Sequence, residues 1–228
     1  MPYFNGYLKP LLNAVNSVRG VSWVYVRSAG ALILALGLNT AMAITSSEAV
    51  DAKHSSAKLP ARASVVPASE GAHRIVILGD SISAEYGVKR GMGWVSLLTQ
   101  RLAQQKIPAT VTNASISGDT TSGGRTRLPS LLRRHAPTIL VIELGANDAL
   151  RGLPLASTRA NIDAMIQMAQ AIGAKVLLLG MQVPPNYGAR YTADFADMFV
   201  QASLAHKTAL VPFLLTGIAD SPRSAALF

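Results

Sequence analysis

Residues 73–83 read HRIVILGDSIS, and four consecutive apolar residues in this stretch, Ile75–Leu78, run directly into Gly-Asp-Ser. A short, solidly apolar run that ends in a glycine turn is typical of a buried strand in a parallel sheet, because helices cover both faces of such a sheet. Apolar residues at helical spacing follow between Trp94 and Leu102. The stretch therefore predicts a strand, a tight polar turn and a helix.

The same alternation continues along the rest of the chain. Further strands are predicted at Val111–Ala114, Ile139–Leu144, Val176–Leu179 and Ala209–Val211. Helical spacing predicts helices around Leu128–Leu132, around Ile162–Ala169 with Ser157 as the N-cap, and over residues 193–205. Strands that alternate with helices indicate an α/β protein with a parallel sheet of about five strands, joined by right-handed crossovers and covered on both faces. The expected strand order is 2-1-3-4-5.

Each of the first three predicted strands is followed by a short turn of glycine and small polar residues. The turns are Gly79-Asp80-Ser81, Ser117-Gly118-Asp119 and Gly145-Ala146-Asn147-Asp148. In an open parallel sheet, ligands bind beyond the carboxyl ends of the strands, where the strand order reverses. With the order 2-1-3 the three turns meet there, which predicts a polar site that contains Ser81, Gly118 and Asn147.

These three residues have the chemistry for acyl transfer. A serine on a tight strand-to-helix turn can act as a nucleophile when a base removes its proton. Its attack on a carbonyl creates an oxyanion, which needs donors about 3 Å away. The backbone N–H groups of Ser81 and Gly118 and the side-chain amide of Asn147 are suitable donors. Each turn alone is an ordinary turn motif, and only the three together, in this order, indicate a site.

Four segments carry a resemblance to a known family. They are ILGDSISAEYG at 77–87, NASISGDTTSGG at 113–124, VIELGANDALRG at 141–152 and PPNYGARY at 184–191. The first three resemble the first three sequence blocks of the SGNH (GDSL) hydrolases, and the fourth resembles a loop of the bacterial periplasmic thioesterase I/lysophospholipase/arylesterase branch. The similarity covers about residues 74–220. It implies a flavodoxin-like three-layer α/β/α fold and metal-free hydrolysis of esters or thioesters, with Ser81 as nucleophile and Gly118 and Asn147 in the oxyanion hole.

The sequence departs from the family pattern after the fifth predicted strand. Family members carry an Asp-x-x-His block there, which supplies the base and the acid that orients it, and the segment GIADSPRSAALF at 217–228 has no such block. We therefore expect the catalytic Asp and His and the final helix to be missing, as in a truncated or frameshifted reading frame or a fragment. His206, His135 and Asp220 are poor substitutes, and His206 is expected to be a surface histidine.

The first seventy residues are predicted to precede the domain. Residues 29–38, AGALILALGL, follow Arg27 and precede Ala41-Met42-Ala43, which is typical of a secretory signal peptide. A membrane anchor is the alternative, but the apolar core is short. A translation start nearer Val26 would give a leader of ordinary length. The expected organisation is a signal peptide at 1–43, a flexible spacer at 44–72 and the hydrolase domain at 73–228, with a periplasmic or secreted product that keeps no membrane span.

Composition excludes several other classes of protein. The chain has 228 residues, of which 50% are hydrophobic and 14% charged, and it has no cysteine. These values exclude collagen, low-complexity and disulfide-scaffold proteins. The formal net charge is +9, but the basic residues are scattered, so a basic surface is favoured over a nucleic-acid partner. We found no metal cluster, phosphate loop or nucleotide fingerprint, and no cofactor is predicted.

Three functions are compatible with this pattern. The first is a secreted hydrolase of small acyl esters or thioesters, lipids among them, that has lost its base. The second is a catalytically silent binding protein that uses the same pocket, and the third is a carbohydrate-ester deacetylase. Asp80, Leu150 and Tyr187 are the predicted substrate-binding residues, and the apolar ones weakly favour an acyl chain.

Overall fold

The computed structural model describes residues 72–219 of the chain. The predicted signal peptide, nearly all of the predicted spacer and Asp220 lie outside the described residues. A membrane-crossing helix is not found within residues 72–219, where every helix is too short or too polar to span a bilayer.

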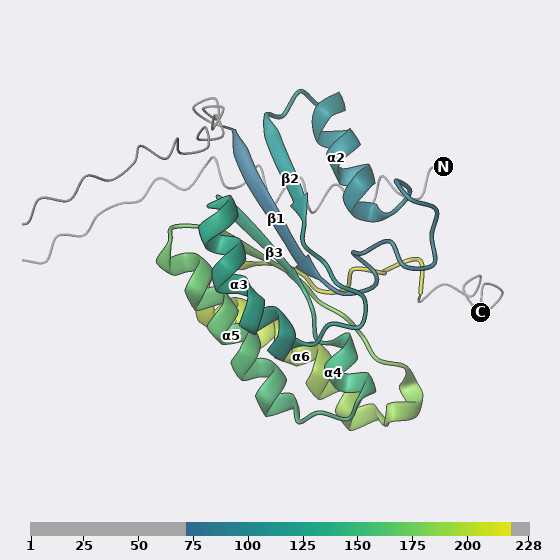
Figure 1. Ribbon diagram of the computed structural model, residues 1–228. Coiled ribbons are helices and arrows are strands. Elements are labelled where there is room, and N and C mark those ends of the chain that lie inside the picture. Colours follow the sequence, from purple (N-terminus) through teal and green to yellow (C-terminus); the bar gives the residue numbers. More distant parts are fainter. Residues whose placement is uncertain (1–71, 220–228) are drawn as a thin grey trace, which may run out of the picture. The chain divides into compact units, whose positions relative to one another are not determined.

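The centre of the domain is a single parallel sheet of five strands (Figure 1). The strands are β1 (His73–Gly79), β2 (Ala109–Asn113), β3 (Ile139–Glu143), β4 (Lys175–Leu179) and β5 (Ala209–Val211). Their order is β2-β1-β3-β4-β5, and every neighbouring pair is parallel. The predicted fold class and strand order are therefore confirmed, and the order reverses between β1 and β3.

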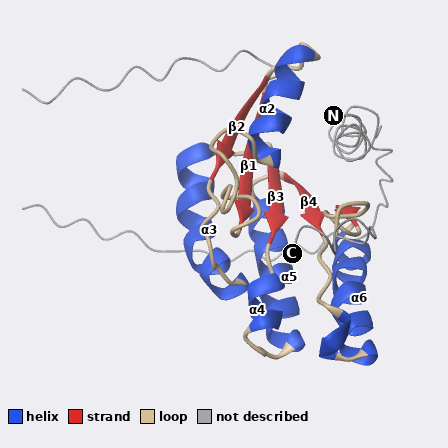
Figure 2. Ribbon diagram, turned by 90° about the vertical axis from the view of Figure 1, so that its right-hand side faces the viewer, coloured by secondary structure: helices blue, strands red, loops and turns tan. Residues whose placement is uncertain are grey.

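Helices cover the sheet on its two faces. They are α2 (Trp94–Gln104), α3 (Thr121–His135), α4 (Ala146–Leu150), α5 (Leu155–Ala171) and α6 (Ala189–His206), with a 3-10 turn, η1, at Pro185–Tyr187. Figure 1 shows α2 on one side of the sheet and α3 and α5 on the other, and Figure 2 shows the strand arrows pointing toward one common edge. This is the predicted three-layer arrangement. No helix follows β5 in the part of the chain that the structure describes.

The core lies between the central strands and the helices. All five residues of β3 are buried, and Ile77 and Leu78 of β1 are fully enclosed. Leu98 faces the sheet from α2, while Leu128 of α3 packs into the same core from the other layer. Unbroken apolar strands are expected in this position, since a central parallel strand has no solvent-facing side.

Two local predictions differ from the structure. Ser157 is not the N-cap of α5, because the helix begins at Leu155 and Pro154 occupies the cap position. The carbonyl of Pro154 accepts the first helical hydrogen bond, from the Ser157 N–H at 2.9 Å, so Ser157 already lies in the first turn. The segment of α4 was predicted as a turn and that of η1 as part of a loop, because one helical turn is too short to show a periodic apolar pattern.

Candidate active site

Ser81 lies in the turn directly after β1, at the carboxyl edge of the sheet. The carbonyl of Asp80 accepts the Ala84 N–H at 2.9 Å, and the carbonyl of Ser81 accepts the Tyr86 N–H at 3.1 Å. The turn needs a glycine at 79, because a Cβ there would lie 2.6 Å from Ser83 Oγ and 2.8 Å from a Glu143 carboxyl oxygen. The chain can therefore turn sharply and leave Ser81 partly exposed.

Gly118 is held next to this turn by the segment that leaves β2. The Ile116 N–H donates to the carbonyl of Gly79 at 3.0 Å, so the second turn runs alongside the first. Gly118 has a φ of +77°, a left-handed conformation that favours glycine. Its carbonyl accepts a hydrogen bond from Arg151 Nη2 at 2.8 Å. This hydrogen bond restrains the orientation of the Gly118 carbonyl group.

Asn147 lies in α4, immediately after β3, and it contacts the first turn directly. Its Nδ2 donates to Asp80 Oδ2 at 3.0 Å. The neighbouring Asp148 is buried and accepts hydrogen bonds from the Thr121 N–H at 2.8 Å and from Thr121 Oγ1 at 2.5 Å. The third turn is therefore tied to the first by Asn147 and to the start of α3 by Asp148. The structure brings the three predicted turns together, as the strand order required.

A pair of buried carboxyl groups lies beneath Ser81. Glu143, the last residue of β3, is paired in register with Gly79. Both Glu143 and Asp80 are at most 1% exposed. Glu143 Oε2 accepts the Ser83 hydroxyl at 2.7 Å, and Ser83 Oγ in turn accepts Trp94 Nε1 at 3.1 Å. Burial, and then the charge of Asp80, raise the pKa of Glu143 to about 8, and burial also raises the pKa of Asp80.

The sequence analysis did not single out Glu143. The signal that could have found it is a carboxylate inside an otherwise apolar strand, ILVIEL, next to a glycine turn. An ionisable group at such a place is buried by its neighbours, and a buried carboxyl group beside a cleft is a candidate functional group.

The other predicted substrate-binding residues occupy different environments. The Asp80 carboxylate is buried and is engaged by the Ile82 N–H at 3.1 Å as well as by Asn147. Leu150 is 57% exposed at the end of α4, and Tyr187 is 37% exposed in η1, where its ring stacks on Tyr191 with centroids 6.1 Å apart. Both apolar residues follow strands at the same edge as Ser81, so they remain candidates for contact with a substrate.

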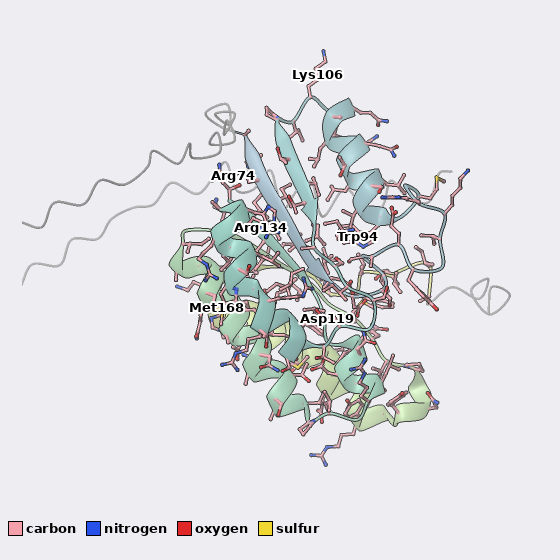
Figure 3. The ribbon with its side chains drawn as sticks, viewed as in Figure 1. Arg74, Trp94, Lys106, Asp119, Arg134 and Met168 are labelled. Carbon is pink, nitrogen blue, oxygen red and sulfur yellow. The ribbon has the colours of Figure 1, made fainter. Side chains whose placement is uncertain are left out.

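The three histidines of the described region lie at the opposite edge of the sheet. His73 is the first residue of β1, so the whole strand, about 20 Å long, separates it from the Ser81 turn. His135 ends α3, and the carbonyl of the next residue accepts Arg74 Nε at 2.7 Å, beside the start of β1. In Figure 3, Arg74 and Arg134 lie toward that edge, and Trp94 and Asp119 lie toward the other.

His206, the third of these histidines, ends α6, and two residues separate it from the start of β5. Its Nε2 lies 2.9 Å from Asp163 Oδ1, and Asp163 also binds Arg159 Nε at 2.8 Å. His206 is partly buried in this ion-pair cluster, which lies on the helix layer away from Ser81. No described residues form a cluster of three or more His, Cys, Asp or Glu side chains that could hold a metal ion.

A family model matches this arrangement along most of the described chain. The model of the GDSL-like Lipase/Acylhydrolase family matches residues 77–227, which include all three turns. The chain belongs to this family. The resemblance that the sequence motifs indicated is thereby confirmed, and the chain is a GDSL hydrolase of esters or thioesters.

The chain is similar to bacterial esterases and thioesterases. The chain is 51% identical to Esterase TesA of Pseudomonas aeruginosa over 147 residues, which are 64% of this chain and 73% of the relative. It is 36% identical to Thioesterase 1/protease 1/lysophospholipase L1 of Escherichia coli strain K12, over 67% of this chain and 72% of the relative. The crystal structure of TesA superposes with a TM-score of 0.64 at 50% identity, covering 65% of this chain and 83% of that chain.

Proposed function

We propose that this GDSL hydrolase cleaves small acyl esters or thioesters through Ser81, with Gly118 and Asn147 as oxyanion donors. The observation that carries the proposal is the hydrogen bond of 3.0 Å between Asn147 and Asp80, because it places a neutral amide donor beside the nucleophile turn. The reaction would follow the usual two steps of acyl transfer. Attack by Ser81 Oγ on the acyl carbon forms the oxyanion, and its collapse breaks the bond to the leaving oxygen or sulfur.

Both steps need a group that moves protons. The base takes the Ser81 hydroxyl proton and delivers it to the leaving group, which departs as an alcohol or thiol. Water then attacks the acyl-enzyme, the base takes a proton from that water, and the proton returns to Ser81 as the carboxylic acid leaves. His73, His135 and His206 lie at the far edge of the sheet, so none of them supports this role.

We therefore expect the 228-residue chain to hydrolyse esters slowly. A triad acts as a unit, and loss of the base costs nearly as much as loss of the serine. The oxyanion hole and substrate binding alone accelerate the reaction about a thousand-fold over the reaction in water. A silent binding protein that uses the same three turns is the second candidate function.

The test uses nitrophenyl esters and four versions of the protein, with and without the appended segment and with and without Ser81→Ala. After circular dichroism and gel filtration establish folding, the 228-residue chain should show little esterase activity, and Ser81→Ala should lower it only slightly. Appending a family-type segment with Asp-x-x-His should raise the rate by several orders of magnitude and make it depend on Ser81. Turnover of the unextended chain at about 10 per second would contradict our account of the base. A Ser81-independent rate in the extended chain would overturn the proposed function.

The exposed apolar residues at the edge of the site support an acyl chain as part of the substrate. Leu150 and Tyr187 favour an acyl chain over a sugar acetate, because a carbohydrate ester presents polar hydroxyl groups to its site. A series of nitrophenyl esters from acetate to decanoate, run beside an acetylated sugar on the extended chain, separates the two. Faster turnover of the sugar acetate would favour a deacetylase.

We also propose export of the product to the periplasm or medium, with cleavage after Ala43. The support is the apolar run at 29–38 before the small residues Ala41-Met42-Ala43. Mass spectrometry of the periplasmic protein should find Ile44 as its first residue. Recovery of the intact N-terminus in the membrane fraction would favour an anchor instead.

A further inference from the structure

The Asp80 carboxylate is placed where it can control the direction of the Asn147 amide. Oδ2 accepts Asn147 Nδ2 at 3.0 Å, and Oδ1 accepts the Ile82 N–H at 3.1 Å. An asparagine amide has a donor side and an acceptor side of nearly the same shape. Only the donor side stabilises an oxyanion, so a flipped amide would present its carbonyl oxygen and repel the developing charge.

An ionised carboxylate selects one of these two orientations. It can only accept hydrogen bonds, so it pairs with Nδ2 of Asn147 and not with Oδ1. That bond uses one of the two N–H groups of Nδ2. The second N–H is then left to face a substrate oxygen. A protonated Asp80 could donate to Oδ1 instead and would permit the flipped orientation.

Glu143 supplies the reason why Asp80 can remain ionised. Glu143 Oε2 accepts the Ser83 hydroxyl and the Asp80 N–H, at 2.7 Å and 3.3 Å, but no N–H or O–H group reaches the buried Oε1. A buried carboxylate oxygen without a donor is costly, whereas a protonated Oε1 is itself a donor. Both carboxylate oxygens of Asp80, by contrast, accept a hydrogen bond, from the Ile82 N–H and from Asn147 Nδ2. The proton of the pair therefore belongs on Glu143.

We propose that Asp80 is a positioning residue that fixes the donor side of the Asn147 amide toward the oxyanion, and that a neutral Glu143 beneath it keeps Asp80 in this role. The inference rests on the proposed function, because it concerns the oxyanion hole of that reaction. It also gives Asp80 a role other than the direct substrate contact expected from the sequence. Trp94 and Ser83 complete the buried chain of hydrogen bonds by orienting Glu143.

The two acids should respond in opposite ways to neutral substitution. Glu143→Gln mimics a protonated acid, because its Nε2 can donate to Asp80 and its Oε1 can accept from Ser83. Asp80→Asn removes the acceptor-only group and frees the Asn147 amide to flip. The readout is covalent labelling of Ser81 by an alkyl fluorophosphonate, followed by intact mass, on the chain extended by an Asp-x-x-His segment. The appended base takes the Ser81 proton, a bond forms from Ser81 Oγ to phosphorus, and fluoride leaves.

The maximal labelling rate and the half-saturating reagent concentration are measured separately, so that an effect on reaction is distinguished from an effect on reagent binding. Asp80→Asn should lower the maximal labelling rate about ten-fold or more and leave the half-saturating reagent concentration unchanged. This loss is smaller than that of a missing oxyanion donor, because a flipped amide still samples the donating orientation. Glu143→Gln should label within about two-fold of the wild-type rate. The double variant Asp80→Asn/Asn147→Ala should be no slower than Asn147→Ala alone, because Asp80 acts through Asn147. Asp163→Asn, which removes a carboxylate from the α5 ion-pair cluster, is the control and should label normally.

Four other results would overturn parts of this scheme separately. If Ser81→Ala labels as fast as wild type, the proposed function is wrong, and the positioning role is wrong with it. If labelling depends on Ser81 but Asp80→Asn is unchanged, or if its effect multiplies with that of Asn147→Ala, only the positioning role is wrong. A greater loss for Glu143→Gln than for Asp80→Asn would also overturn it.

A measurement on the wild-type protein covers the case in which Asp80→Asn does not fold. The side-chain amide signals of Asn147 can be assigned in a nitrogen-15 spectrum by their loss in Asn147→Ala. Bonding to a buried carboxylate should give two well-separated proton signals, one of which exchanges slowly with solvent. Two overlapping, fast-exchanging protons would contradict a fixed amide.

Discussion

Arg151 Nη2 donates a hydrogen bond of 2.8 Å to the carbonyl oxygen of Gly118. A peptide bond is planar, so the direction of this carbonyl also sets the direction of the next N–H along the chain, and the arginine restrains the whole loop. The bond is exposed to solvent, and a bond of that kind contributes about 1 kcal/mol. We expect Arg151→Ala to slow Ser81 labelling about five-fold through greater mobility of the oxyanion loop.

The control for Arg151 is another exposed arginine. Arg190 lies in α6, and its Nε is 3.7 Å from an Asp194 carboxylate, with a side chain that is 96% exposed. Arg190→Ala removes the same charge without touching the Gly118 loop, and it should leave the labelling rate unchanged. Equal slowing by the two variants would mean that general charge, and not the bond to Gly118, matters for the reagent.

Gly118→Ala tests the backbone conformation of the second turn. A non-glycine residue in the left-handed region costs about 1–2 kcal/mol, and Gly118 has a φ of +77°. A Cβ at this position would meet only Arg151 Nη2, at an ordinary 3.6 Å, so the cost is conformational and not steric. We expect the loop to shift and Ser81 labelling to slow ten-fold or more, because the oxyanion donor is weakened. Complete loss of such a donor slows a reaction about 10²-fold.

Gly173 provides a matched comparison for that experiment. It also has a φ of +77°, a Cβ there would meet nothing within 4 Å, and it lies after α5 at the opposite edge of the sheet. Gly173→Ala should therefore lose a similar amount of stability in chemical unfolding and keep a normal labelling rate. If both variants label normally, the conformation of Gly118 is not needed for the reaction.

Asn147→Ala removes the side-chain donor of the proposed oxyanion hole. One lost donor costs about 3 kcal/mol of transition-state stabilisation, so turnover in the chain extended by an Asp-x-x-His segment should fall by roughly a hundred-fold or more. The Michaelis constant for a nitrophenyl ester should change little, because the donor acts on the transition state. A near-normal turnover number would mean that Asn147 only closes the turn after β3.

The sequence predicted the sheet because its central strands are uninterrupted apolar runs. Ile139–Glu143 and Ala209–Val211 were each located to within one residue. Right-handed crossovers restrict the topology but do not fix the strand order, so the convergence of the turns was predicted on the condition that the order is 2-1-3. The structure meets that condition, and Ser81 and Asn147 lie in one region.

Properties that depend on tertiary contacts were not predictable in this way. The burial of Asp80 and the raised pKa of Glu143 arise from neighbours that lie 60 or more positions apart, such as Ser83 against Glu143. The start of α5 depended on Pro154, whose fixed φ of −60° and extended ψ place the first helical turn earlier than the cap rule suggested.

His206→Ala tests whether this histidine could serve as a base. Its Nε2 is bound to Asp163, and it ends α6 at the edge of the sheet opposite Ser81. We expect no change in the residual esterase rate and a loss of at most about 1 kcal/mol in the free energy of unfolding, the usual value of a partly exposed ion pair. A fall in the esterase rate to the level of Ser81→Ala would assign the base to His206 after all.

Glu143 makes the stability of the domain depend on pH. Its pKa is about 8 in the folded protein against an ordinary value of 4.5, so the folded state binds the proton more tightly than the unfolded state. Stability is therefore fully present below about pH 4.5 and is lost as pH rises toward 8, with a slope of up to about 1.4 kcal/mol per pH unit. Denaturant unfolding should show this decline, and Glu143→Gln should make it shallower because glutamine stays neutral. Asp80, whose pKa burial also raises, adds its own decline in both proteins.

Glu85→Gln is the matched control. The Ser96 hydroxyl and two backbone N–H groups lower the pKa of Glu85, so its effect on stability should fall on the acid side. A decline between pH 4.5 and 8 that is as steep in Glu143→Gln as in the wild-type protein would contradict the raised pKa of Glu143.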